Sequence, residues 1–249
     1  MTPSPAGSPT WSWARTAIGF KPEYLDFRRG IHVGNLEPHE RLTRILKSAL
    51  ETRYREPFVT ERWGRGVFWQ WIGFLPRANR AAMPLSSGVS FGCSKFFVEV
   101  DTGDQRFKCG LQIERGYLRA PAESRACRLR PDWDWNRLIK GLTPRSTLFR
   151  ELKRLAGEGF EVHAGSWSTP SVFTKGTLPG ATRLRSVLGH ATATEWCGLQ
   201  VYYALDEPAV QASSGVDLID TMLAVFDEVT PAMNQCMIVK LRLEPPGPQ

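Results

Sequence analysis

Three carboxylates on neighbouring predicted strands are the residues best suited to metal chemistry in this chain. Glu99 and Asp101 alternate along residues 94–101, and Glu114 lies in the next apolar stretch, residues 106–118. Carboxylates that converge from adjacent strands can hold Mg²⁺ for phosphodiester cleavage. One hypothesis is therefore a metal-dependent nuclease or phosphodiesterase, with these three acids as catalytic candidates and Mg²⁺ as cofactor in that case alone.

The turn expected between these two strands gives the carboxylates cationic neighbours. A two-residue turn at positions 103 and 104, with glycine first as a type II′ turn prefers, places Glu99 opposite Lys108 and Asp101 opposite Arg106. Opposite charges directly across an antiparallel pair stabilise it by roughly 0.2–1 kcal/mol. The same register turns three residues of each strand toward the core: Phe96, Val98 and Val100 opposite Leu111, Cys109 and Phe107. We therefore interpret the hairpin as scaffold and assign no metal ligands.

The most cationic segment follows the second strand. It contains the residues that we predict to contact nucleic acid, namely Arg115, Tyr117, Arg119, Arg125, Arg128 and Arg130. A basic loop between a strand and a helix can follow a phosphate backbone, and an aromatic ring within it can stack on a base. Two alternatives stay open: a solvated loop that pairs with Asp132 and Asp134, or a contact with a partner protein. Residues 62–71 and 26–30 add further arginines and aromatic rings, but the sequence does not indicate whether they share one face.

The amino-acid composition limits the kinds of protein to which this chain can belong. The chain has 249 residues and a net charge of +7, most of its 32 basic residues are arginine, and apolar residues make up 42%. No run approaches the ~20 apolar residues of a membrane span, so we expect no membrane contact. The five cysteines are scattered and odd in number, and the N-terminus lacks a secretory pattern; both features favour the cytoplasm.

The periodicity of apolar residues predicts an α+β fold. We expect a central, mostly antiparallel sheet flanked by at least three helices, in the order α-β-β-β-α-α-β-(loop)-β-α-β. The predicted helices cover residues 35–55, 135–142, 143–159 and 214–229, and the predicted strands cover 65–76, 86–101, 106–118, 160–164, 195–207 and 236–244. Residues 165–181 are expected to be loop, and 182–190 are ambiguous between strand and helix. In the strand at 65–76, Trp69 and Trp71 alternate with apolar residues, so both faces look buried.

The first six elements, α-β-β-β-α-β, resemble the core order of restriction-endonuclease-like nucleases. That resemblance implies one acid on a first strand and, on the strand that follows it, a second acid, any residue and then a lysine. Residues 112–115 read Gln-Ile-Glu-Arg, so the lysine is absent, and we expect Glu114 to be drawn to Arg115 or Arg119.

These observations lead to one domain and a ranked set of functions. We predict a globular domain at residues 13–243 between flexible tails at 1–12 and 244–249. The first hypothesis is a non-catalytic, nucleic-acid-associated binding module that contacts phosphates through its arginine-rich loop. The nuclease is the second hypothesis, and a protein-interaction subunit of a larger cytosolic complex is the third. Whether the chain is an enzyme stays open.

Overall fold

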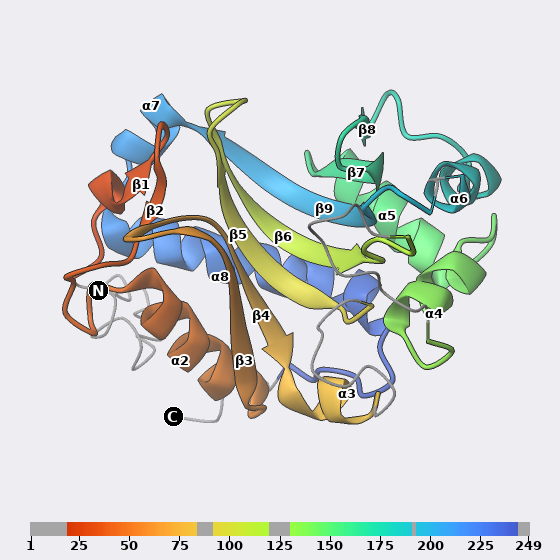
Figure 1. Ribbon diagram of the computed structural model, residues 1–249, viewed down its shortest axis with the longest axis horizontal. Helices are drawn as coiled ribbons and strands as arrows, with labels where there is room; N and C mark the ends of the chain where they lie inside the picture. Colours follow the sequence, from red (N-terminus) through yellow and green to blue (C-terminus); the bar gives the residue numbers. More distant parts are fainter. Residues whose placement is uncertain (1–18, 84–91, 120–129, 191–192, 244–249) are drawn as a thin grey trace, which may run out of the picture.

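In the computed structural model, which describes residues 19–83, 92–119, 130–190 and 193–243, nine strands form one antiparallel sheet (Figure 1). The strands follow the order β1-β2-β4-β5-β6-β9-β7-β8, and β3 pairs with β4 beside this path. The strands are β1 (Leu25–Asp26), β2 (Gly30–His32), β3 (Phe58–Arg65), β4 (Phe68–Pro76), β5 (Lys95–Asp101), β6 (Arg106–Glu114), β7 (Glu161–Ser166), β8 (Pro170–Phe173) and β9 (Cys197–Asp206). The predicted α+β class with a central antiparallel sheet is confirmed.

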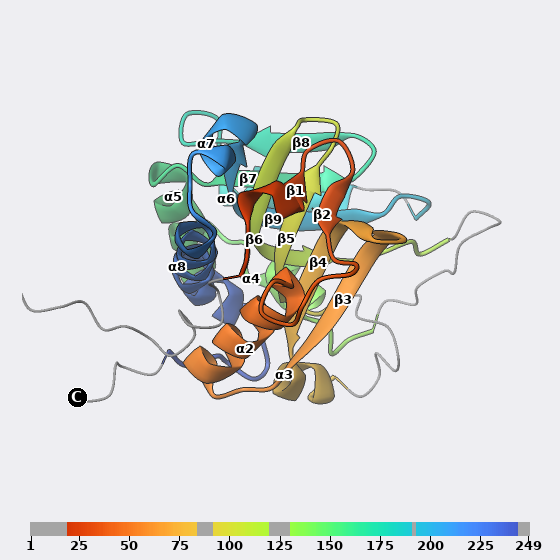
Figure 2. The same ribbon diagram turned by 90° about the vertical axis from the view of Figure 1, so that its left-hand side faces the viewer.

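Helices pack on one face of this sheet, as the side view shows for α2, α5 and α8 (Figure 2). The helical elements are η1 (Pro22–Tyr24), α2 (Leu42–Tyr54), α3 (Arg77–Ala81), α4 (Asp134–Gly141), α5 (Thr147–Gly157), α6 (Ala181–Gly189), α7 (Glu207–Gln211) and α8 (Gly215–Asn234). We call this side of the sheet the helix face. We call the opposite side the polar face, because it carries Lys95, Glu99, Lys108, Gln112, Glu114 and Gln200.

Helix α8 illustrates how local signals and packing combine. Its first turn is a capping box, in which Ser214 accepts a hydrogen bond from the Asp217 backbone N–H and the Asp217 carboxylate accepts one from the Ser214 backbone. Further along, Phe226 is buried and stacks on Phe96 of β5, with 4.8 Å between the ring centroids. The apolar side of α8 thereby covers the middle of the sheet.

Several predicted elements differ from the observed ones. The strand expected at 236–244 is wrong for its described part, because α8 continues to Asn234 and residues 236–243 form no regular structure. The ambiguous segment 182–190 is helical, as α6, and the expected loop at 165–181 contains β8. Strand β3 was missed because its polar and glycine residues hide any alternation. The predicted tails, 1–12 and 244–249, lie outside the described residues.

A bulge between β3 and β4 moves two tryptophans to opposite faces. The register pairs Trp63 with Trp71 but Gly64 with Trp69, so one residue of β4 is left over between them. Trp69 consequently packs against the main core on the helix face, whereas Trp71 donates a hydrogen bond to Gln112 on the polar face. The sequence predicts that the side chains of this strand alternate between the two faces of the sheet. That alternation is interrupted here, because the extra residue of the bulge reverses the faces of the residues on one side of it.

Candidate functional site

The β5–β6 hairpin has the predicted register. Glu99 lies opposite Lys108 and Asp101 lies opposite Arg106, and the three predicted core pairs are also present. The connection itself is longer than the predicted two-residue turn. It runs from 102 to 105, with the left-handed conformation at Gln105 (φ 51°). The Asp101 carboxylate accepts hydrogen bonds from two backbone N–H groups of this loop, at Gly103 and Asp104, and so stabilises it.

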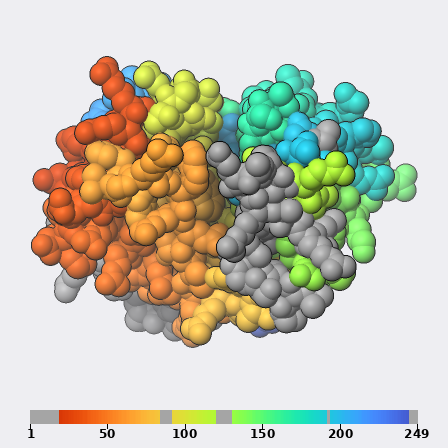
Figure 3. Space-filling view, viewed as in Figure 1, coloured from red at the N-terminus to blue at the C-terminus, as the bar shows by residue number. Residues whose placement is uncertain are grey.

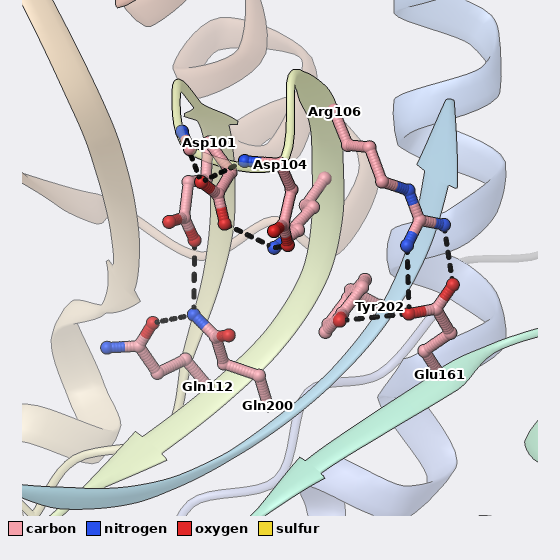
Figure 4. A network of polar contacts seen from close by, with 10 residues as sticks. Asp101, Asp104, Arg106, Gln112, Glu161, Gln200 and Tyr202 are labelled. Atoms are coloured by element: carbon pink, nitrogen blue, oxygen red, sulfur yellow. Dashed lines mark hydrogen bonds and ion pairs between the residues drawn. The ribbon is translucent and has the colours of Figure 1, made fainter. Parts of the chain in front are cut away.

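The charged partners within the hairpin differ from those predicted. The Lys108 ammonium lies 2.6 Å from the Asp101 carboxylate and 3.1 Å from that of Asp104. Burial raises the pKa of Asp101, but the hydrogen bonds from Lys108 and the loop outweigh it and leave the pKa below its usual value. Arg106, the predicted partner of Asp101, instead binds Glu161 of β7 (Figure 4). Long side chains thus pair diagonally, or past β9 to β7, rather than directly across the hairpin.

Glu114 pairs with a lysine from the neighbouring strand rather than with Arg115 or Arg119. The Lys95 ammonium is 2.6 Å from Glu114 Oε1, and the Trp196 indole N–H donates to Glu114 Oε2 at 2.7 Å. Burial lowers the pKa of Lys95, but Glu114 and Glu61 outweigh it and raise the pKa above its usual value. Residues 112–115 contain no lysine, but Lys95 of the neighbouring strand β5 places its ammonium group next to Glu114.

The three catalytic candidates do not converge on one point. Glu114 is six residues along β6 from Lys108, which is the register partner of Glu99. At roughly 3.3 Å per residue, the two acids occupy rows about 20 Å apart. Within the described residues, no three His, Cys, Asp or Glu side chains are grouped to hold a metal ion. The carboxylates instead belong to separate ion pairs and hydrogen bonds.

Glu99 is the carboxylate on the polar face with the least compensation. Among the described residues, one side chain donates a hydrogen bond to its carboxylate, namely the Gln200 amide at 3.3 Å from Oε2. The same Gln200 amide donates at 2.9 Å to Gln112 Oε1, which also receives the Trp71 indole N–H at 3.0 Å. Figure 4 shows Gln200 and Gln112 side by side in this network. Burial raises the pKa of Glu99 to about 6, although the charge of Lys108 lowers it in part.

The described part of the arginine-rich segment offers few side chains to a phosphate backbone. Arg115 is buried, with an exposed fraction of 6%, and donates to the Glu195 carbonyl. Tyr117 packs edge-to-face against Trp196, with ring centroids 5.3 Å apart. Arg119 is exposed and Arg130 is half-buried. Arg125 and Arg128 lie outside the described residues, so their predicted role stays a prediction.

A second basic and aromatic surface forms where the β3–β4 hairpin meets the β1–β2 turn. We call it the hairpin-tip surface, and it consists of Arg28, Arg29, Arg62, Trp63 and Arg65. Strand β2 pairs with the start of β4, and this brings the two segments together (Figures 1 and 3).

Within the hairpin-tip surface, Trp63 is the most exposed of the large apolar side chains described, at 69%. The Arg29 guanidinium lies 4.2 Å from the centre of the Phe68 ring, and that of Arg62 lies 4.3 Å from the centre of Trp69. Arg29 is also held by Asp26 at 2.6 Å. The aromatic rings thus support guanidinium groups that remain at the surface. Arginines at 26–30 and 62–71 were visible in the sequence, but their proximity depends on β2 pairing with β4.

No family model matches the chain, and comparisons with curated proteins and with solved structures find no match either. Among the described residues, no helix is long and apolar enough to cross a membrane. The hairpin-tip surface and the polar face are therefore interpreted from their own chemistry.

Proposed function

We propose that the protein is a nucleic-acid-binding module that contacts single strands through its hairpin-tip surface. The observation that carries the proposal is the exposed Trp63 indole in a hairpin that also has exposed Arg65 and, on its other side over Trp69, Arg62. Strand β2 pairs with this hairpin and follows the exposed Arg28 and Arg29. Modules that bind single strands combine cations along the backbone with aromatic rings on which bases stack. The net charge of +7 favours the same class of ligand.

The chemistry proposed for this surface is binding without catalysis. Arginine can hold phosphate oxygens bidentately while its planar group rests on an aromatic ring, as Arg62 rests on Trp69. The Trp63 indole would stack on an unpaired base. Arg125 and Arg128 lie outside the described residues, and their predicted contribution is separable by mutation.

The test is fluorescence anisotropy of labelled single- and double-stranded DNA and RNA, measured from low to physiological salt. Trp63→Ala is expected to weaken binding to single strands by about 1–3 kcal/mol, whereas Trp63→Phe retains most of the affinity. Replacing Arg62 and Arg65 together by glutamine is expected to flatten the dependence of log K on log salt by about 1.4, because each lost phosphate contact on a single strand contributes roughly 0.7. Arg145→Gln, which removes an exposed arginine at the α4–α5 connection, is the matched control.

Two results would contradict this assignment. The absence of binding at low salt would remove nucleic acid as the ligand. Binding that survives Trp63→Ala and the double arginine variant, but is lost when Arg125, Arg128 and Arg130 are all replaced by glutamate, would return the contact to the arginine-rich loop.

A protein partner is the second candidate, and the observation that favours it is the position of β3. Among the described strands, β3 pairs only with β4, so its outer edge has no strand neighbour. An edge strand with exposed Trp63 and Arg62 can bind an extended segment of another protein, and both residue types are enriched in interface hot spots. Loss of a partner on Trp63→Ala, together with no affinity for nucleic acid, would favour this candidate over the first.

A further inference from the structure

The polar face contains a carboxylate whose environment lacks a dedicated cation. Glu99 lies opposite Lys108, but the Lys108 ammonium is bonded to Asp101 at 2.6 Å and to Asp104 at 3.1 Å. Two further carboxylates, Asp101 and Asp104, and one lysine therefore lie around Glu99. A carboxylate that loses water without gaining a cation is costly, and such groups are found more often at functional sites than elsewhere.

Neighbouring side chains hold Glu99 and a second acceptor in place. Gln200 uses its amide NH₂ for both Glu99 and Gln112, and Gln112 is itself fixed by the Trp71 indole. The Gln200 side chain is buried, with an exposed fraction of 6%, and in the described part of the chain its side-chain oxygen has no hydrogen-bond partner. Two oxygens, one from Glu99 and one from Gln200, are thus available to N–H donors.

The pair remains within reach of solvent. Glu99 and Trp71 are both half-buried, whereas Gln112 and Gln200 behind them are buried. A group that enters here meets acceptors and a local excess of negative charge, although the chain as a whole is basic. That combination selects a cation with N–H groups over an anion or a neutral apolar group.

We propose that Glu99 and Gln200 form a recognition site for an organic cation with N–H donors, an ammonium or a guanidinium group. The cation would add to the charge that Lys108, bonded to Asp101 and Asp104, supplies to Glu99 only in part, and it would give a donor to the Gln200 oxygen. Its source is either a small amine or a lysine or arginine side chain of a partner, because both present the same group. Trp63 of the hairpin-tip surface lies in the same row of the sheet, because it pairs with Trp71 and Trp71 pairs with Glu99. Cation binding at Glu99 does not depend on nucleic-acid binding.

The test uses NMR of protein labelled with ¹³C at the glutamate carboxyl carbon. Methylguanidinium chloride is expected to shift the Glu99 signal saturably at pH 7. Tetramethylammonium chloride at equal ionic strength has the charge without N–H donors and is expected to leave the signal unchanged. Glu99→Gln is expected to weaken binding at least tenfold, judged from the Trp71 indole signal, whereas Glu37→Gln, at an exposed glutamate, retains it.

Binding should also compete with protonation of Glu99. Because the pKa of Glu99 is raised to about 6, affinity at pH 5 is expected to be about tenfold lower than at pH 7. The other titratable groups that face Glu99 are Asp101, Asp104, Lys108 and Tyr202. His163 of β7 lies opposite Gln200, and its pKa is lowered to about 4, below the pH 5–7 interval. The pKa of Asp101 is lowered and those of Lys108 and Tyr202 are raised, so none of these three shifts toward the pH 5–7 interval.

The two sources of the cation are separated by a short peptide. A Gly-Arg-Gly peptide that binds more tightly than methylguanidinium would identify a partner's side chain as the ligand, and equal or weaker binding would identify a small amine. The proposal is overturned if methylguanidinium gives no saturable shift, if tetramethylammonium gives the same shift, or if Glu99→Gln binds as the wild type does.

Discussion

The Lys95 ammonium lies 2.6 Å from the Glu114 carboxylate, and both side chains are buried on the face of the sheet opposite the helices. This ion pair links β5 to the end of β6, and the Trp196 indole completes it. It gives the Glu114 carboxylate a cationic partner and an N–H donor within the protein itself. It also shows that the Lys95–Glu114 end of the polar face is buried with its charges paired, whereas Glu99 and Trp71 on the same face are half-buried.

Breaking the Lys95–Glu114 pair from one side should destabilise the protein strongly. Glu114→Gln leaves the Lys95 ammonium buried with Glu61 at 3.4 Å as its remaining anionic partner. We expect a loss of about 3–5 kcal/mol in the free energy of unfolding, because the charge stays desolvated. Chemical denaturation of Glu114→Gln and of the double variant Lys95→Met/Glu114→Leu checks this. The double variant should recover much of the loss, and equal destabilisation in both would show that shape rather than charge decides.

Glu99 should make stability fall with rising pH in a defined window. Its folded-state pKa of about 6 lies above the ordinary value of 4.5. The proton is bound more tightly in the folded state, so this contribution is fully present below pH 4.5 and is lost as pH rises through 6. The loss amounts to about 2 kcal/mol. Urea unfolding of wild type and Glu99→Gln from pH 4 to pH 7.5 is the measurement, and the difference between the two proteins should change across that window.

The contribution of His163 to stability changes with pH in the opposite direction to that of Glu99. For this reason the wild type is compared with Glu99→Gln, because the pH dependence of the wild type alone would combine both groups. Burial, and after it the charge of Lys108, lower the pKa of His163 to about 4. Its contribution to stability is therefore lost as pH falls from its ordinary value of 6.5 toward 4. A constant difference between wild type and Glu99→Gln over this interval would contradict the assignment of the raised pKa to Glu99.

Gly110 should tolerate no side chain, because the strands beside it are too close. A Cβ at this position would lie 2.0 Å from the Val201 carbonyl oxygen and 2.7 Å from the Tyr202 Cα, both backbone atoms of β9. We expect Gly110→Ala to lower the unfolding free energy by about 3 kcal/mol through displacement of β9. Thermal unfolding checks this, with Gly157→Ala as the matched control. A Cβ on Gly157 at the end of α5 meets nothing within 4 Å, so that variant should be neutral or up to about 1 kcal/mol more stable.

The capping box of α8 offers a smaller, local prediction. Ser214→Ala removes the acceptor for the Asp217 N–H at 3.1 Å and is expected to cost about 1 kcal/mol of stability. Ser214→Asn, which can accept the same hydrogen bond, should retain most of it. Equal losses in both variants would mean that the cap contributes little and that packing of α8 on the sheet fixes its start.

The sequence by itself determined the α+β class, the amphipathic helices and the register of the β5–β6 hairpin. These follow from local periodicity and from a short connection, so residues near in the chain were sufficient. The pairing of Glu99 with Lys108 across the strands was predicted for the same reason.

Only the tertiary structure decided which charges meet. Lys95 reaches Glu114 diagonally within the β5–β6 hairpin. Arg106 reaches Glu161, and Arg29 lies near the β3–β4 hairpin, because strands distant in sequence come together in one sheet. A long flexible side chain has several oppositely charged groups within reach, and the burial of each group in the folded protein determines which ion pair forms. The bulge in β4, which separates Trp69 from Trp71, is likewise a property of two paired strands and not of either one alone. The sequence therefore determines the elements, and the packing of those elements determines the candidate sites.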